Sequence, residues 1–230
     1  MIIYKNFLYA LLFFTLFLFS LISHAGGVAL GSTRVIYPLN DKQTSLALSN
    51  TDERNQFLIQ TWVEDKEGKK TKDIIITPPL FVSKPKSENT LRIILNNSNL
   101  PKDRESLYWI NSKSIPAVDK NDIKDKNILQ IAVLSRIKLF VRPENLNTLP
   151  SDAPELLIFN YKNNNLTIKN PSPYYMTLIN LKYGEEKLSS IMIPPMDEYL
   201  LKVNSKKNII SYQTINDYGA NTPLITKNIN

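Results

Sequence analysis

The sequence has no cysteine and a single histidine, His24. The absence of cysteine excludes disulfide bonds and a thiolate nucleophile. His24 lies within the first 25 residues, which are predicted below to be removed, so a serine–histidine–aspartate triad and an ordinary zinc site are not expected either. Acidic residues are present, but no catalytic motif surrounds them, so we expect no catalytic residue, no metal site and no other cofactor. Composition leaves open only the carboxylate-based chemistry of a glycosidase.

Long segments with helical spacing of apolar residues are also missing. Short runs rich in valine, isoleucine, leucine, tyrosine and phenylalanine instead alternate with polar clusters, a pattern that predicts β-strands. The predicted strands of the first half are Val28–Tyr37, Ser45–Ser49, Phe57–Glu64, Ile74–Ile76, Thr90–Leu95, Ser106–Asn111 and Leu129–Val141. Such a series is typical of an immunoglobulin-like sandwich.

A proline at 143 interrupts this series, and a proline cannot donate to a strand ladder. A second all-β series follows it, with predicted strands at Leu156–Tyr161, Leu166–Asn170, Met176–Lys182, Ser190–Ile193, Tyr199–Val203 and Asn208–Asn216. The chain is therefore predicted to be all-β, with an N-terminal immunoglobulin-like domain at 26–145, a C-terminal β-sandwich domain at 146–230, and a groove between them.

The first 25 residues read MIIYKNFLYALLFFTLFLFSLISHA and predict a secretory signal peptide. Lys5 precedes a long apolar run, and the small residues Ser23 and Ala25 fit a cleavage site. A permanent membrane anchor is the alternative, since the run is nearly long enough to span a bilayer. The cleavage signature and the polar continuation favour removal, so we expect no stable anchor.

The net charge is +7, and loss of residues 1–25 would lower it by one because Lys5 leaves. A basic balance can indicate nucleic acid or an anionic surface as a partner. Here the lysines are scattered over stretches that read as hairpin ends, so we expect solvated loops and no nucleic-acid partner.

The stretch Asn127–Pro143, NILQIAVLSRIKLFVRP, carries an apolar residue at most alternate positions. One row consists of Leu129, Ile131, Val133, Ser135, Ile137 and Leu139. Taken alone, this row predicts an ordinary core strand with one buried face.

Five motifs occur in a characteristic order. They are LPKDRESLYWIN (Leu100–Asn111), NILQIAVLSRIKLFVRP (Asn127–Pro143), NPSPYYMTL (Asn170–Leu178), IPPMDE (Ile193–Glu198) and INDYGA (Ile215–Ala220). Together they closely resemble the periplasmic chaperones of the chaperone–usher pathway, over essentially the whole of the chain after residue 25. The resemblance implies two immunoglobulin-like domains in an L shape. It also implies a periplasmic, ATP-independent protein that binds fimbrial subunits, folds and caps them by lending a strand, and delivers them to an outer-membrane usher.

In this family the last strand of the first domain is the lent strand. The resemblance therefore implies that Leu129, Ile131, Val133 and Ser135 form the donor row that enters the subunit's open groove. The remaining face, with Ile128, Ala132 and Leu134, is expected to meet the chaperone's own core or rim. The lent edge is exposed, so a self-capping dimer is a further expected partner, although no motif marks one.

Two charge sites are also implied by the resemblance. Arg34 and Lys138 match the family's cleft residues that hold the subunit's C-terminal carboxylate and so fix the register of pairing. Glu105, Arg142 and Asp217 match a charged cluster that bridges the domains. We assign this cluster to orientation rather than to stability.

The connection Ala117–Lys126 is short and lacks the cysteine pair of the long-loop class. The resemblance is therefore to the short-loop class, most closely to the chaperones of type 1 fimbriae. Val141 stands where an aromatic residue often precedes Arg-Pro, so packing there is expected to differ. Two other classes are kept as alternatives: a structural fimbrial subunit or adhesin, and a secreted carbohydrate-binding sandwich or enzyme.

Overall fold

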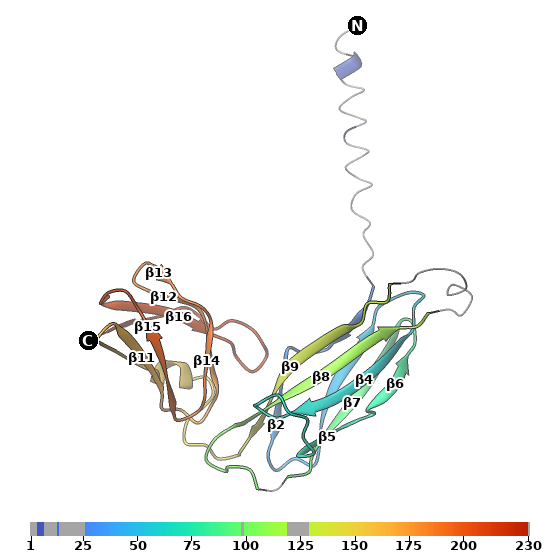
Figure 1. The fold of residues 1–230 in the computed structure, drawn as a ribbon, viewed down its shortest axis with the longest axis horizontal. Coiled ribbons are helices and arrows are strands. Elements are labelled where there is room, and N and C mark those ends of the chain that lie inside the picture. The colour runs from blue at the N-terminus through green and yellow to red at the C-terminus, as the bar shows by residue number, and fades with distance from the viewer. Residues whose placement is uncertain (1–3, 7–12, 14–25, 98, 119–128, 230) are drawn as a thin grey trace.

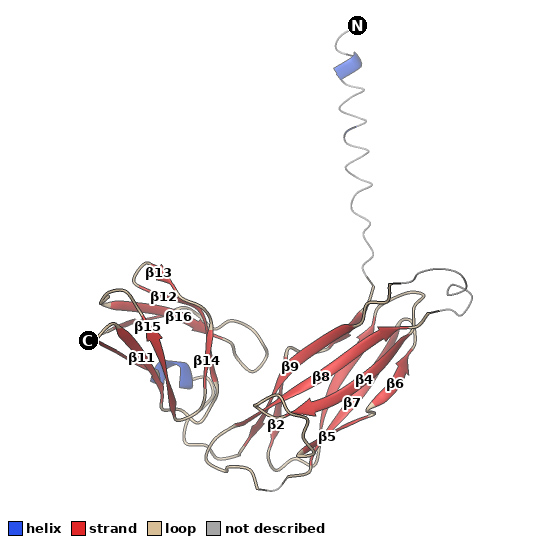
Figure 2. Ribbon diagram, viewed as in Figure 1, coloured by secondary structure: helices blue, strands red, loops and turns tan. Residues whose placement is uncertain are grey.

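The computed structural model describes residues 4–6, 13, 26–97, 99–118 and 129–229. Two β-sandwiches meet at an angle in an L shape, with the strands of each packed around their own core (Figures 1 and 2). Within the described ranges no helix is long and apolar enough to cross a membrane. The predicted signal peptide lies almost entirely outside these ranges, as does most of the predicted connection Ala117–Lys126.

The N-terminal sandwich consists of a four-stranded sheet and a five-stranded sheet. The first has the order β1-β3-β7-β5, with bounds Val28–Leu30, Thr44–Asn50, Ser87–Leu95 and Ile74–Thr77. The second has the order β2-β9-β8-β4-β6, with bounds Arg34–Pro38, Val133–Arg142, Ser106–Pro116, Phe57–Glu64 and Leu80–Ser83. The alternate apolar residues of both sheets pack between them in one buried cluster, which includes Leu139 and Val141.

The predicted single strand Val28–Tyr37 is wrong, because the chain changes sheet inside it. β1 pairs with β3, whereas β2 pairs with β9 in the other sheet. The link between them contains Gly31, at which an added Cβ would lie 3.0 Å from the Cβ of Ala47. This close approach lets the chain cross the edge of the sandwich, so that Arg34 begins β2 beside β9.

The C-terminal sandwich is built in the same way from shorter strands. One sheet has the order β10-β11-β15, with bounds Ile158–Lys162, Asn165–Asn170 and Asp197–Lys202. The other has the order β13-β12-β16-β17, with bounds Glu186–Lys187, Met176–Tyr183, Ile209–Thr214 and Ile225–Asn228, and β14 (Ile191–Ile193) also pairs with β12. A separate buried cluster fills this sandwich. The boundary between residues 145 and 146 stays a prediction.

Four details of the second half and of the sheet edges differ from the sequence prediction. Leu156 belongs to a short 3-10 helix, Ala153–Leu156, and not to a strand. The strands β6, β13 and β17 were missed. Each is only two to four residues long, so alternation of apolar residues has little length in which to show itself.

Because each sandwich has its own core, shortening a core side chain should destabilise mainly the sandwich that contains it. Leu139 is fully buried in β9, so Leu139→Ala should lower the unfolding free energy of the N-terminal sandwich by about 2–5 kcal/mol. Both tryptophans of the chain, Trp62 and Trp109, lie in this sandwich, so tryptophan fluorescence during urea unfolding reports it selectively. Leu166→Ala, equally buried in the other core, is the matched control. An equal shift of the tryptophan transition in both variants would contradict two separate cores.

Candidate functional site

Strand β9 is covered unevenly on its two edges. On one side β8 pairs with it antiparallel along its whole course, from Ser114 opposite Val133 to Ser106 opposite Val141. On the other side β2 pairs with it in parallel only from Lys138 to Arg142. Among the described residues, therefore, Val133–Ile137 has one sheet neighbour and one open edge, which runs along the sheet towards the groove between the domains (Figure 1).

The open edge carries an exposed apolar row. Leu129, Ile131 and Val133 are 85%, 66% and 56% exposed, respectively. Ser135 follows at intermediate burial, and then the row enters the core at Leu139. Isolated exposed apolar residues are ordinary, but a row that continues a core into solvent marks a surface that needs a partner.

Two predictions about this segment are wrong. The strand begins at Val133 and not at Leu129, so Leu129 and Ile131 precede it. The faces were also misassigned: Val133 and Ser135 share their face with buried Leu139, whereas Leu134 is exposed. The predicted donor residues Val133 and Ser135 therefore belong to the same row of side chains as the core residue Leu139, because the alternation along the strand continues without a break. Ile128 lies outside the described residues.

Arg34 and Lys138 stand opposite each other where the open edge of β9 ends. They are register partners on β2 and β9. The guanidinium of Arg34 donates from Nη1 to the carbonyl oxygen of Ile215 at 3.1 Å and lies over the ring of Phe140. Lys138 Nζ donates to Thr177 Oγ1 at 3.4 Å. Burial lowers the pKa of both groups, and the charge of Arg34 lowers the pKa of Lys138 further.

The other cations around the groove are already neutralised. Arg136 lies over the ring of Trp109 and donates to Glu64 at 3.0 Å. Arg142 pairs with two carboxylates, described below. Within the described part of the chain, neither Arg34 nor Lys138 is in ion-pair distance of an acid. Two half-buried positive charges therefore lie side by side without an ion-pair partner, although the more distant carboxylates of Asp217 and Glu105 attract Arg34. This arrangement favours an anionic ligand.

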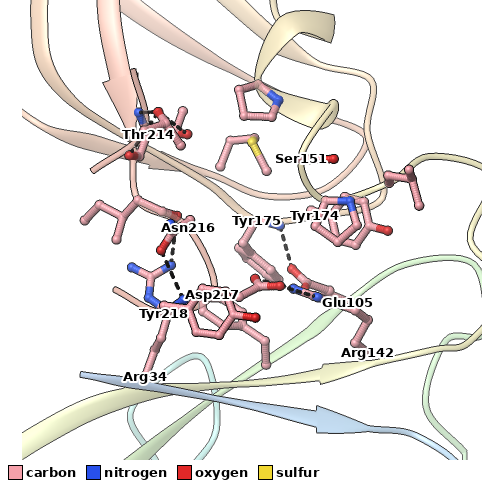
Figure 3. A pocket seen from close by; sticks show the side chains of 17 residues that line it. Arg34, Glu105, Arg142, Ser151, Tyr174, Tyr175, Thr214, Asn216, Asp217 and Tyr218 are labelled. Atoms are coloured by element: carbon pink, nitrogen blue, oxygen red, sulfur yellow. Dashed lines mark hydrogen bonds and ion pairs between the residues drawn. The ribbon is translucent and has the colours of Figure 1, made fainter. Parts of the chain in front are cut away.

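Glu105, Arg142 and Asp217 form one hydrogen-bonded cluster between the domains (Figure 3). Arg142 donates from Nε to Glu105 at 2.8 Å, and from Nη1 and Nη2 to the two oxygens of Asp217 at 2.7 Å each. The second oxygen of Glu105 accepts the backbone N–H of Tyr175 at 2.8 Å. One arginine of the first domain is thus held by a buried acid of its own domain and by an acid of the second.

Protonation behaviour follows from this geometry. Burial raises the pKa of Glu105 above its ordinary value, and the attraction of Arg142 only partly offsets that effect. Burial alone would lower the pKa of Arg142, but the hydrogen bonds to Asp217 and the charge of Glu105 raise it instead. Arg142 therefore stays charged, and Glu105 takes up a proton at a higher pH than an exposed glutamate does.

Two cavities lie between the domains on either side of Arg34. One, of about 370 Å³, is shown in Figure 3 and is lined mainly by aromatic and apolar residues, including Phe140, Tyr174 and Tyr175. The other, of about 340 Å³, contains Arg34, Lys138, Arg136 and Trp109. The uncompensated charges face this second space. Across the described residues no group of histidine, cysteine or acidic side chains could hold a metal ion.

The comparisons with known proteins agree with this geometry. Residues 27–147 match the family model described as "Pili and flagellar-assembly chaperone, PapD N-terminal domain", and residues 152–226 match "Pili assembly chaperone PapD, C-terminal domain". The chain belongs to the family of pilus-assembly chaperones. Two matches in the same order as the two sandwiches cover most of the chain, so the membership concerns the whole architecture rather than one domain.

Curated relatives support the same family. The chain is 48% identical over 207 residues to the probable fimbrial chaperone SfmC of Escherichia coli K12, covering 90% of this chain and 90% of that protein. It is 50% identical over 202 residues to the chaperone protein FimC of the same strain, covering 87% and 83% of the two chains.

Solved structures place the fold in the same family. The periplasmic chaperone SfaE superposes with a TM-score of 0.76 at 46% identity, covering 89% of this chain and all of that one. The structure of a Salmonella enterica SafA pilin in complex with the SafB chaperone matches with a TM-score of 0.79 at 26% identity, covering 90% and 98%. The predicted two-sandwich fold and the predicted family are thereby confirmed.

Sequence analysis missed three parts of the site. These are the carbonyl of Ile215 that holds Arg34, the hydroxyl of Thr177 near Lys138, and the stack of Arg136 on Trp109. The first two cross between domains, so no local pattern could reveal them. The stack of Arg136 on Trp109 could have been predicted. Arg136 lies on the same face of its strand as Lys138, and the neighbouring strand contains a tryptophan.

The raised pKa of Glu105 gives a prediction about pH. The folded chain binds this proton at a higher pH than the unfolded chain does, so ionisation of Glu105 should lower the unfolding free energy as pH rises from the ordinary glutamate value through the raised one. Glu105→Gln should lack that decline. It should also cost about 1–3 kcal/mol, because an amide cannot accept from both Arg142 and Tyr175.

The measurement is urea unfolding of the wild type and of Glu105→Gln over a series of pH values. Glu88→Gln, on the exposed face of β7, is the control for loss of one carboxylate from the same domain. If the wild type and Glu105→Gln depend on pH with the same slope in this window, the raised pKa is refuted.

Proposed function

We propose that this chain is a periplasmic chaperone that binds fimbrial subunits by lending them strand β9, and that it passes them to an outer-membrane usher. The observation that carries the proposal is the open edge of β9, which bears an apolar row and ends at two uncompensated cations. Related chaperones are named as fimbrial, one is called periplasmic, and one is solved in complex with a pilin. The proposed function requires no catalytic step.

The lent edge supplies two kinds of binding. Its backbone groups can pair with an extended subunit strand whatever the subunit's side chains are. The row Leu129, Ile131, Val133 and Ser135 would fill the groove left by the subunit's missing strand. Each apolar side chain fully buried contributes roughly 1.5–3 kcal/mol, so the three exposed ones supply several kcal/mol together.

Arg34 and Lys138 are proposed to bind the subunit's C-terminal carboxylate. A chain terminus is a unique landmark, and a slip of one residue would turn every inserted side chain to the wrong face. An anchor at the end of the open edge would fix the register before the row is inserted. The uncompensated charges and the space beside them support this role.

The cluster of Glu105, Arg142 and Asp217 is proposed to set the angle between the domains. It joins the end of β9 to the loop after β16, so it fixes how far the second domain stands from the anchor. The backbone bond from Glu105 N–H to Pro173 oxygen, at 2.9 Å, adds a constraint from the same point.

The usher must bind a surface that stays free while a subunit occupies β9. The opposite edge of the same sheet meets this condition, since β6 lies at the far end of the strand order. Leu80 and Val82 of β6 and Leu58 of β4 are exposed, and Leu58 is the register partner of Val82. We assign this apolar patch to the usher.

The first prediction of the proposal concerns capture of subunits. Tagged wild type, expressed with its fimbrial operon, should bring down small fimbrial subunits from the periplasm. Lys138→Ala should weaken capture by about tenfold or more, because a charge-assisted bond is lost. Ile131→Asp should nearly abolish capture, because a carboxylate would have to enter the subunit's apolar groove. Quantitative mass spectrometry of the captured proteins measures both.

Two controls separate these effects from loss of charge or of surface apolarity. Lys169→Ala and Leu200→Asp change exposed strand residues of the C-terminal sandwich and should capture subunits like the wild type. If the wild type captures no subunit, the proposed function fails. If Lys138→Ala captures as well as the wild type, the anchor assignment fails while the chaperone role stands.

The usher assignment makes a separate prediction. Leu80→Glu should capture subunits normally but assemble fewer surface fimbriae, so chaperone–subunit complexes should accumulate in the periplasm. Electron microscopy counts the fibres, and binding of the purified complex to the usher is measured directly. Ile75→Glu, an exposed change on the other sheet, is the control. Normal fibre numbers with Leu80→Glu would rule out this surface.

A further inference from the structure

The turn between β16 and β17, residues 215–220, reaches across the groove and contacts the first domain at three points. The carbonyl of Ile215 accepts from Arg34, and Asp217 pairs with Arg142. The third contact is between Gly219 and Thr33, the residue that directly precedes Arg34. Two of the three contacts thus involve Arg34 or its neighbour in the chain.

The turn is rigid because its own hydrogen bonds close it. Asn216 donates its N–H to the carbonyl of Ala220 at 2.9 Å, and its side-chain oxygen accepts from the N–H groups of Tyr218 and Ala220 at 3.1 and 2.9 Å. Gly219 donates back to the carbonyl of Asn216 at 3.0 Å. A change at one position of this turn is therefore transmitted to its contacts rather than absorbed within it.

Gly219 has no room for a side chain. Its φ is +83°, a conformation that disfavours residues with a Cβ. An added Cβ would lie 2.1 Å from Thr33 Oγ1, far inside van der Waals contact. With the turn rigid and Asp217 held by Arg142, the overlap would be relieved by rotating the Thr33 side chain or by displacing Thr33 or the second domain.

The orientation of Arg34 depends on this contact. Its only hydrogen bond within the described residues is to the carbonyl of Ile215, and its Nε is buried without a partner. The guanidinium is held by this bond and by its position over the ring of Phe140, so a shift of the Ile215 carbonyl would change its direction. Directional pairing with a carboxylate tolerates little displacement. The position of the turn therefore decides where Arg34 points.

We propose that Gly219 is a positioning residue for the carboxylate anchor. By lacking a side chain it lets the turn seat against Thr33, so that the carbonyl of Ile215 holds Arg34 in the direction needed to meet the subunit's terminus. The inference rests on the proposed function, because it assigns a ligand to Arg34. In addition, the turn of the second domain orients Arg34 before the subunit binds.

Four variants isolate the overlap with Thr33 from the strain of a left-handed alanine. Gly219→Ala introduces both. Gly184→Ala, at φ +61° in a hairpin of the same domain, introduces comparable backbone strain, and its Cβ would crowd only the side chain of Lys207, at 3.1 Å from Cγ. Thr33→Ala with Gly219→Ala removes the clashing oxygen and leaves the Cβ atoms at an ordinary 3.5 Å. Thr33→Ala alone completes the cycle.

One measurement needs no ligand. The chain has no cysteine, so cysteines introduced for Glu88 and Lys162, one exposed strand position in each sandwich, can carry a pair of spin labels. Gly219→Ala should displace the distance distribution between the labels, and the double variant should return it to the wild-type position. A distribution unchanged by Gly219→Ala would refute the positioning role.

The second measurement tests directly whether the site of Arg34 and Lys138 prefers a peptide that ends in a carboxylate. The probes are two synthetic peptides with the C-terminal strand sequence of the captured subunit, one ending in a free carboxylate and one in a carboxamide. Wild type should prefer the free acid, and Gly219→Ala should reduce that preference by about fivefold or more. The double variant and Gly184→Ala should keep it. A general loss of folding would lower binding of both peptides and leave the ratio unchanged.

The outcomes separate the two proposals. If the wild type binds both peptides equally, the carboxylate anchor fails, and the inference fails with it. If the wild type prefers the acid and Gly219→Ala keeps that preference, only the role of Gly219 fails. Loss of preference that Thr33→Ala does not restore would also overturn it, because strain and not the contact would be the cause.

Discussion

The pairing of β2 with β9 begins only at Arg34 and Lys138, and the other features of the site depend on that limit. Had β2 continued towards the start of β9, the edge of Val133–Ile137 would be covered and its apolar row would be part of an ordinary sandwich. The change of sheet at residues 31–33 is what shortens β2. The crossing of the chain beside Ala47 therefore leaves one edge of β9 open and places Arg34 where that open edge ends.

The four basic residues around the groove differ in the groups that lie beside them. Arg136 and Arg142 each have an acid within hydrogen-bonding distance, whereas Arg34 and Lys138 have a carbonyl and a hydroxyl. Burial disfavours the charges of Arg34, Lys138 and Arg142, whereas Arg136 is exposed. Within the described residues, Arg136 and Arg142 form ion pairs, and Arg34 and Lys138 do not. The energetic cost of the latter two would be recovered when an anion binds, so the same burial that lowers their pKa values favours the carboxylate. The subunit carboxylate is the ligand in the proposed function, and the charge balance of the groove supports that proposal.

Much of the fold could be predicted from the sequence, because alternation along a strand is a local property. The strands β4, β5 and β12 were predicted close to their observed positions, whereas β8 continues five residues beyond its predicted end. The order of the motifs identified the family. The change of sheet after β1 was missed, although the core-facing positions shift from even (Val28 and Leu30) to odd (Val35 and Tyr37) across Gly31. The faces of β9 were misassigned because periodicity gives two rows but not which one meets the core. The roles of Ile215 and Gly219 depend on contacts between domains more than 180 residues apart in sequence, which no motif records.

The two cores and the joint between them are held by different forces. Each sandwich buries its own apolar cluster. Among the described residues, the joint includes an ion-pair cluster, one backbone–backbone hydrogen bond, side-chain bonds to backbone groups and the contact of Phe140 with Tyr175. Polar contacts are directional but contribute little net free energy, so they set the angle between the domains without strongly stabilising their association. A chain without disulfides must hold this angle by side-chain geometry alone. That requirement explains why a single turn, with a carbonyl, an acid and a glycine at the alternate positions 215, 217 and 219, makes so many of the contacts that cross the groove.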